Sequence, residues 1–91
     1  MGLKSTTVCL GYQQISSLSS STGLTVPSGA TLAVIVPEIY AVRWRDDGTA
    51  PTGSVGMPLG VGTTLSYDGD LNRIRFIEQA AGAKLSVSYY A

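Results

Sequence analysis

The stretch that decides the fold is residues 31–36, which read Thr-Leu-Ala-Val-Ile-Val. Every second residue from Leu32 onward is Leu or Val, and Ala33 and Ile35 stand between them. Because side chains alternate between the two faces of a strand, both faces of this strand are apolar. We therefore predict a central strand that is covered on both sides, by packing within the chain or by a neighbouring subunit.

Runs of the same kind recur along the chain. In the run 40–45, Tyr40, Val42 and Trp44 should face inward, while the intervening Arg43 and Arg45 should face outward. Residues 16–23 are rich in serine and predict a loop. The predicted strands are 6–15, 24–26, 31–36, 40–45, 64–67, 73–78 and 84–90.

Turn residues separate these runs. Residues 26–29 read Val-Pro-Ser-Gly, residues 46–48 read Asp-Asp-Gly, and residues 68–70 read Asp-Gly-Asp. A helix over 70–80 is a weaker alternative, since apolar residues there are three apart. Seven or eight short antiparallel strands in one 91-residue domain predict an all-β fold, a small β-sandwich of the jelly-roll type.

The chain carries little charge. Charged residues make up 13% of it, against about 25% in typical domains, and six basic residues balance six acidic ones. Such a surface leaves apolar patches that mark contact sites, and a net charge near zero favours association. The balance argues against nucleic acid as a partner, and no apolar run is long enough to cross a membrane. We therefore expect a soluble homo-oligomer that is made in the cytoplasm.

The residue types also limit the chemistry. The chain has no histidine, which removes the commonest general base and the commonest zinc ligand. The aspartates at 46, 47, 68 and 70 lie in predicted turns, where a carboxylate bonds nearby backbone more often than it acts as an acid. Calcium at 68–70 is a weak alternative. We predict no catalytic site, metal or cofactor, and a buried, inert Cys9 between Val8 and Leu10.

The Gly-rich stretch 48–62 is predicted to be an extended arm or an edge strand, because Pro58 cannot donate to a central ladder. It either contacts another subunit or crosses the end of its own sandwich. An arginine of 43–45 should pair with an aspartate across the following turn. Trp44 is expected to fill the core, and one of Tyr89 and Tyr90 should face inward and the other outward. The predicted interface residues are Arg43, Arg45, Asp46, Asp47, Val55, Met57, Leu59, Val61 and Tyr90.

Four segments carry a resemblance: 42–52 (Val-Arg-Trp-Arg-Asp-Asp-Gly-Thr-Ala-Pro-Thr), 55–59 (Val-Gly-Met-Pro-Leu), 67–71 (Tyr-Asp-Gly-Asp-Leu) and 83–90 (Ala-Lys-Leu-Ser-Val-Ser-Tyr-Tyr). Together they resemble the small β-rich structural proteins of tailed bacteriophage virions. The resemblance implies a capsid decoration or cement protein in the virion, made in the bacterial host.

Such a protein would be a homo-oligomer that contacts capsid or tail proteins, and a trimer would suit a three-fold position. The alternative is a carbohydrate- or receptor-binding module of a fibre or tail, using Tyr12, Trp44 or Tyr90. Residues 1–22 lie outside the resemblance and are predicted to be an attachment segment.

Overall fold

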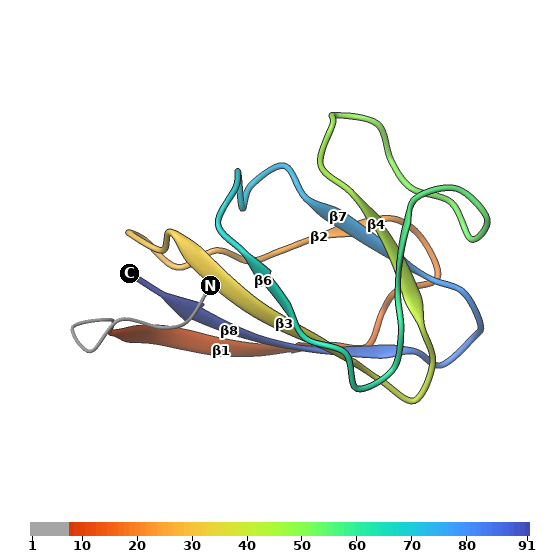
Figure 1. The fold of residues 1–91 in the computed structure, drawn as a ribbon, viewed down its shortest axis with the longest axis horizontal. Helices are drawn as coiled ribbons and strands as arrows, with labels where there is room; N and C mark the ends of the chain where they lie inside the picture. The colour runs from red at the N-terminus through yellow and green to blue at the C-terminus, as the bar shows by residue number, and fades with distance from the viewer. Residues whose placement is uncertain (1–7) are drawn as a thin grey trace.

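A computed structural model describes residues 8–91, which form eight strands and no helix (Figure 1). None of these residues therefore belongs to a helix that could cross a membrane. The all-β prediction is confirmed. The strands are β1 (Cys9–Ile15), β2 (Thr22–Gly23), β3 (Leu32–Glu38), β4 (Val42–Arg45), β5 (Met57–Leu59), β6 (Leu65–Tyr67), β7 (Arg75–Glu78) and β8 (Lys84–Tyr90).

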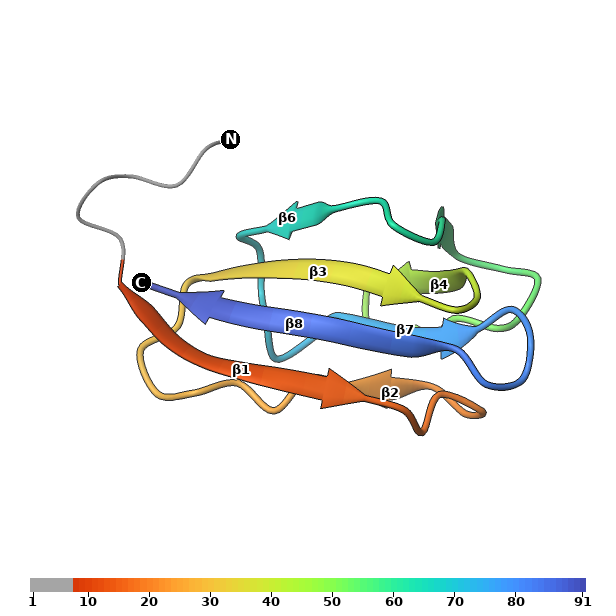
Figure 2. The same cartoon turned by 90° about the horizontal axis from the view of Figure 1, so that it is seen from below.

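The strands form two antiparallel sheets of four strands each, with the orders β1-β8-β3-β6 and β2-β7-β4-β5. We call them sheet A and sheet B. The chain passes repeatedly from one sheet to the other, so that β1 pairs with β8, β2 with β7, β3 with β6 and β4 with β5. Figure 2 shows β1, β8 and β3 side by side in sheet A.

The hydrophobic core lies between the two sheets. In β8, Leu85, Val87 and Tyr89 are buried and alternate with partly exposed residues. Phe76 of β7 and Ile74 before it meet them from the other layer and are fully buried. The prediction that one of the two terminal tyrosines faces inward is confirmed, since Tyr89 is 1% exposed and Tyr90 is only half-buried. One continuous core therefore joins both sheets.

Strand β3 is central in sheet A, as the sequence predicts, with β8 and β6 on its two sides. Ala33 and Ile35 on its inner face are fully buried. On its outer face, Leu32, Val34 and Val36 are only half-buried. The chain thus covers one face of β3 fully and the other in part.

Two local predictions are wrong, and one weaker alternative is excluded. Residues 24–26 form no strand. Leu24 and Val26 are apolar because they pack against the core, although their backbone pairs with no strand. The short strand β2 lies instead at the end of the predicted serine-rich loop. The alternative helix over 70–80 is also absent, because a turn at 71–73 leads into β7.

Cys9 and Tyr40 also differ from the prediction, since both are exposed. Cys9 lies at a β-bulge where β1 begins, and its Sγ lies 3.7 Å from both the Gly11 carbonyl and the Ser88 hydroxyl. Tyr40 precedes β4 in a bend where Ile39 has a φ of 72°, so the strand alternation has not yet begun there. Apolar neighbours in sequence did not place either side chain in the core.

Candidate contact surface

An ion pair fixes the turn that follows β4. Arg45 donates from Nε to Asp47 Oδ1 over 3.0 Å and from a terminal nitrogen to Oδ2 over 2.5 Å. Asp47 also accepts the Thr49 backbone N–H at 3.3 Å, as expected for an aspartate that orders a turn. The arginine holds the pKa of Asp47 down, to about 2. The predicted arginine–aspartate pair is therefore confirmed, with Arg45 as the arginine.

Asp46 ties this turn to the other sheet. Its carboxylate accepts a 2.6 Å hydrogen bond from the hydroxyl of Tyr67, which belongs to β6 in sheet A. The Tyr67 ring meets Trp44 edge to face, with ring centroids 6.0 Å apart. Burial, and then the bond to Asp46, raises the pKa of Tyr67 to about 12. Trp44 packs against the core as predicted, and Tyr67 packs against it as well.

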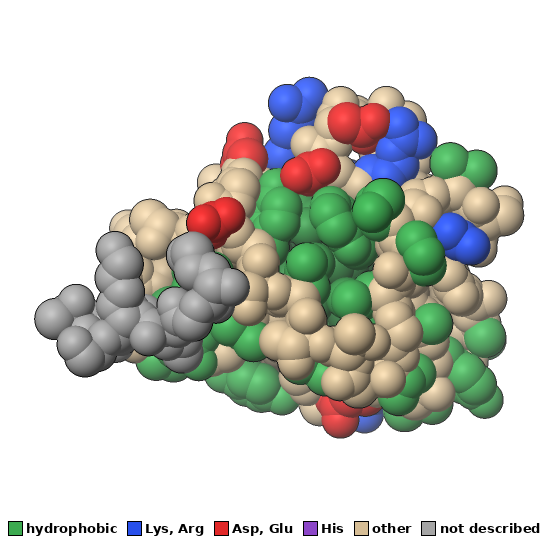
Figure 3. All heavy atoms as spheres, viewed as in Figure 1, with side chains coloured by type: hydrophobic (Ala, Val, Ile, Leu, Met, Phe, Trp, Pro, Cys, Tyr) green, Lys and Arg blue, Asp and Glu red, His purple; other side chains and the backbone are tan. Residues whose placement is uncertain are grey.

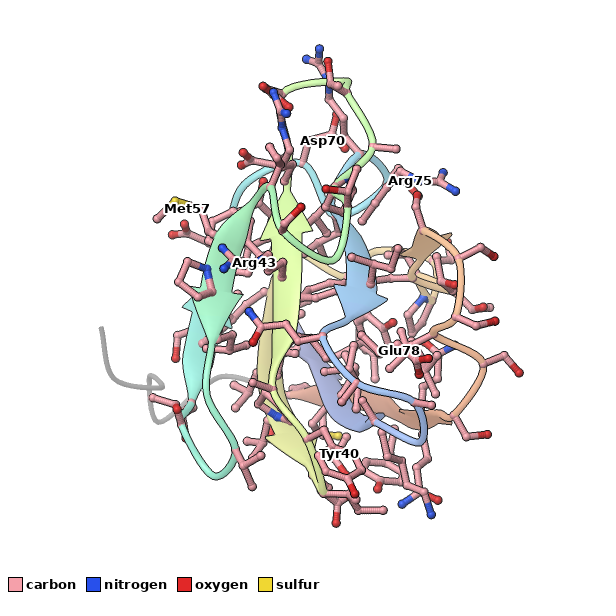
Figure 4. All side chains as sticks on the ribbon, turned by 90° about the vertical axis from the view of Figure 1, so that its right-hand side faces the viewer. Tyr40, Arg43, Met57, Asp70, Arg75 and Glu78 are labelled. Carbon is pink, nitrogen blue, oxygen red and sulfur yellow. The ribbon has the colours of Figure 1, made fainter. Side chains whose placement is uncertain are left out.

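Arg43 holds the loop before β5. Its guanidinium donates to the Gly53 carbonyl at 3.3 Å and to the Gly56 carbonyl at 2.9 Å. Figure 4 shows Arg43 on the face of sheet B that looks toward the viewer, with Met57 near the end of β5. Pro51 in the same loop is buried. The first part of the stretch 48–62 therefore folds back on its own sheet and is not an extended arm.

The second part of that stretch forms β5, which is an edge strand of sheet B and contains Pro58. The edge-strand prediction is confirmed. Leu59 pairs opposite Val42 and is only 8% exposed. Its predicted interface role is wrong, because its side chain belongs to the core of its own chain.

A shallow hollow of about 240 Å³ lies where the β4 turn meets the loop before β5. Val55 and Met57 are more than half exposed and form its apolar wall. The full lining is Arg45, Asp46, Asp47, Val55, Gly56 and Met57. The structure thus brings five of the nine predicted interface residues to one place. An apolar wall beside an ion pair can receive a side chain of a partner protein.

The remaining candidates lie elsewhere. Val61 is exposed in the loop after β5, and Tyr90 lies on the outer face of sheet A opposite Leu32. Figure 3 shows apolar side chains gathered at the centre of one face, between β6 and β4, with acidic and basic side chains above them. Trp44, Leu65 and Tyr67 are partly buried and pack against the core.

Two exposed apolar groups lie outside the nine predicted interface residues, although Tyr12 is a candidate for the alternative carbohydrate-binding role. Ile39 and Tyr40 lie together in the bend between β3 and β4, and Leu10 and Tyr12 lie in β1, just after the exposed Val8. One sequence signal could have indicated the second group, because residues 5–37 contain no charged side chain at all.

In the part of the chain that the structure describes, no three Cys, Asp or Glu side chains come together as a metal site. No known protein family matches this chain, and no curated protein or solved structure matches it. The fold and the surface geometry are therefore the basis for a functional assignment, together with the resemblance of its segments.

Proposed function

We propose that this chain is a non-enzymatic structural protein of a phage particle, which binds the capsid surface or neighbouring subunits as a decoration or cement protein. The observation that carries the proposal is the set of large apolar side chains that a small, weakly charged domain leaves exposed. Surface apolar groups of this kind mark protein contacts. The phage assignment rests on the resemblance of segments 42–52, 55–59, 67–71 and 83–90 to virion proteins.

The strand pairing supports a jelly-roll form for the sandwich. Pairs β1–β8, β2–β7, β3–β6 and β4–β5 are what results when one long antiparallel hairpin rolls up into two sheets. Jelly rolls occur in viral capsid proteins, and also in lectins and cupins. The fold is therefore compatible with a virion protein, and function has to be argued from the surface.

The state of the carboxylates supports a role without catalysis. Asp47 is paired with Arg45, Asp46 accepts from Tyr67, and Asp70 accepts the Asn72 backbone N–H at 3.0 Å. A carboxyl group that acts as a general acid needs a raised pKa, whereas the pKa of Asp47 is lowered to about 2. Each of these groups has a structural partner that accounts for its position.

Co-sedimentation with heads of the phage that encodes the chain tests the proposal. The wild-type protein should pellet with the heads, and a Val55→Asp, Met57→Asp double variant should bind them at least about tenfold more weakly, since two charges would enter the hollow. A double variant of Thr64→Asp and Ala80→Asp is the matched control, because both residues are exposed, lie outside the hollow and are not among the large exposed apolar side chains. A wild-type protein that never pellets with the heads would refute the proposal.

Carbohydrate binding is a second candidate function, and one observation favours it. On the outer face of sheet A, the Tyr12 hydroxyl lies 3.1 Å from Ser86 Oγ, and Ser86 donates to Glu38 at 2.7 Å. Gln14 joins them through a 3.4 Å bond to Glu38. An exposed aromatic ring beside a row of polar groups is suited to a sugar. A glycan array with wild type and Tyr12→Ala tests it, and no signal at millimolar host polysaccharide would exclude the carbohydrate role.

A further inference from the structure

The two sheets have four edge strands, and three of them are protected against pairing with other chains. Strand β2 has two residues, β6 has three, and β5 has three and contains Pro58. Very short strands and proline are common devices that stop edge-to-edge association. Strand β1 differs from the other three because it is seven residues long.

The outer edge of β1 has no backbone partner among residues 8–91. Its ladder is with β8 alone, and the bonds between Val8 and Ala91 continue that ladder. The loop nearest to β1 makes no hydrogen bond to the β1 backbone, since Thr25 bonds the Gln13 amide group and Pro27 only packs against Gly11. Within residues 8–91 nothing pairs with the carbonyl and amide groups along this edge, so they can pair with another strand.

The usual protection is absent from most of β1. The strand contains no proline and no charged residue, and no charge occurs anywhere in residues 5–37. A bulge interrupts the register between Cys9 and Gly11, but pairing is regular from Gly11 to Ile15. Tyr12 is 63% exposed on the outer face of the sheet, with its hydroxyl 3.1 Å from Ser86 of β8, and Val8 and Leu10 add exposed apolar surface where the strand begins. A long, neutral, partly apolar edge is a template for an added strand.

We propose that β1 pairs antiparallel with β1 of a second copy of this chain, so that the two A sheets become one continuous sheet across a two-fold axis. This inference rests on the proposed function, because both treat the chain as a protein that acts by binding other subunits.

The neutrality of the edge is what favours a second copy as the occupant. A charged partner strand would find no opposite charge on β1, whereas an identical strand matches it in charge and apolar character. Two identical antiparallel edges also offer carbonyl and amide groups at the same spacing, so each satisfies the other. An isologous contact of this kind closes at two subunits and leaves no further β1 edge open.

Sedimentation velocity on the full-length chain, across a concentration series, tests the proposal. The wild type should dimerise, and Tyr12→Lys should weaken the dimer by at least about tenfold, because two like charges would meet near the two-fold axis. Gln14→Lys, on the same strand, should weaken it in the same direction without removing an aromatic ring. Ser66→Lys is the matched control, since Ser66 is exposed on β6, at the opposite edge of sheet A from β1, and this variant should dimerise as the wild type does.

Hydrogen exchange identifies the surface. Amides in residues 11–15 should become more protected as protein concentration rises, and those of β5 and β6 should not change. A strictly monomeric wild type, a trimer, or a dimer without this added protection would overturn the proposal. Binding to phage heads by a monomer would overturn the dimer alone, whereas a dimer that ignores the heads would overturn the virion function alone.

Discussion

Replacing Tyr89 by Phe removes one hydroxyl from the core and leaves the ring in place. In the wild type this hydroxyl donates to Gln13 Oε1 over 2.6 Å, which ties β8 to β1 inside the sandwich. Gln13 Oε1 also accepts the Thr25 backbone N–H at 3.2 Å, so the substitution does not leave that oxygen without a donor. The cost should therefore be that of one ordinary hydrogen bond, about 1 kcal/mol.

For a domain of this size, a loss of about 1 kcal/mol should lower Tm by roughly 4 to 8 °C. Urea denaturation should give the same loss as a lower midpoint with an unchanged m value, since the surface that unfolding exposes is the same. Tyr90→Phe is the matched control. Tyr90 lies on the outer face of sheet A, and its hydroxyl has no hydrogen bond to any residue in 8–91, so the change should stay within about 0.5 kcal/mol.

The same substitution has a pH signature. Burial raises the pKa of Tyr89 to about 12 from its ordinary value of 10. A raised folded-state pKa means that the tyrosine's contribution is complete below pH 10 and is lost as pH rises from 10 to 12. Tyr89→Phe should therefore lose less stability than the wild type over that range. Equal behaviour of Tyr89→Phe and Tyr90→Phe in both experiments would refute the inward placement of Tyr89.

Three further predictions follow from the β4 turn and the loop after it. Asp47→Asn should make the stability depend less on pH in acid solution. The lowered pKa of Asp47 stabilises the wild-type fold above pH 3.8, and this stabilisation is lost as pH falls toward about 2. Thermal melts from pH 5 to about 2 will measure the difference. Gly56→Ala should destabilise by about 1 to 3 kcal/mol in urea, since φ is 143° and a Cβ would lie 3.2 Å from Pro51 Cβ; no loss would contradict this backbone. Leu59→Asp should cost more than about 3 kcal/mol and Met57→Asp less than about 1, as compared by thermal unfolding; equal losses would contradict their different burial.

The sequence was most informative where alternation was regular. The bounds of β8 follow from its alternation alone, and the pair between Arg45 and Asp47 was predictable because the two residues are neighbours in one turn. Contacts between distant segments were not predictable: nothing in the sequence links Asp46 to Tyr67 across 21 residues, since that bond depends on how the sheets stack.

Spacing also failed to distinguish burial along one face. Met57 and Leu59 are two residues apart and lie on the same side of β5, yet one is exposed and the other is in the core. Leu59 lies opposite the fully buried Val42, while Met57 lies opposite the partly exposed Trp44 near the end of the sandwich. Whether a side chain of β5 is buried depends on how deeply it lies beneath the opposite sheet. The spacing of residues along one strand does not specify that depth.

The central claim is that this chain works by association and not by catalysis. Sedimentation of the wild-type chain, alone and with heads of the phage proposed to encode it, tests that claim most directly. The account predicts a self-associated species and a pellet that contains the chain together with the heads. A chain that stays monomeric up to about 1 mM, where even a binding free energy near −4 kcal/mol would be visible, and that leaves the heads unbound, would contradict it.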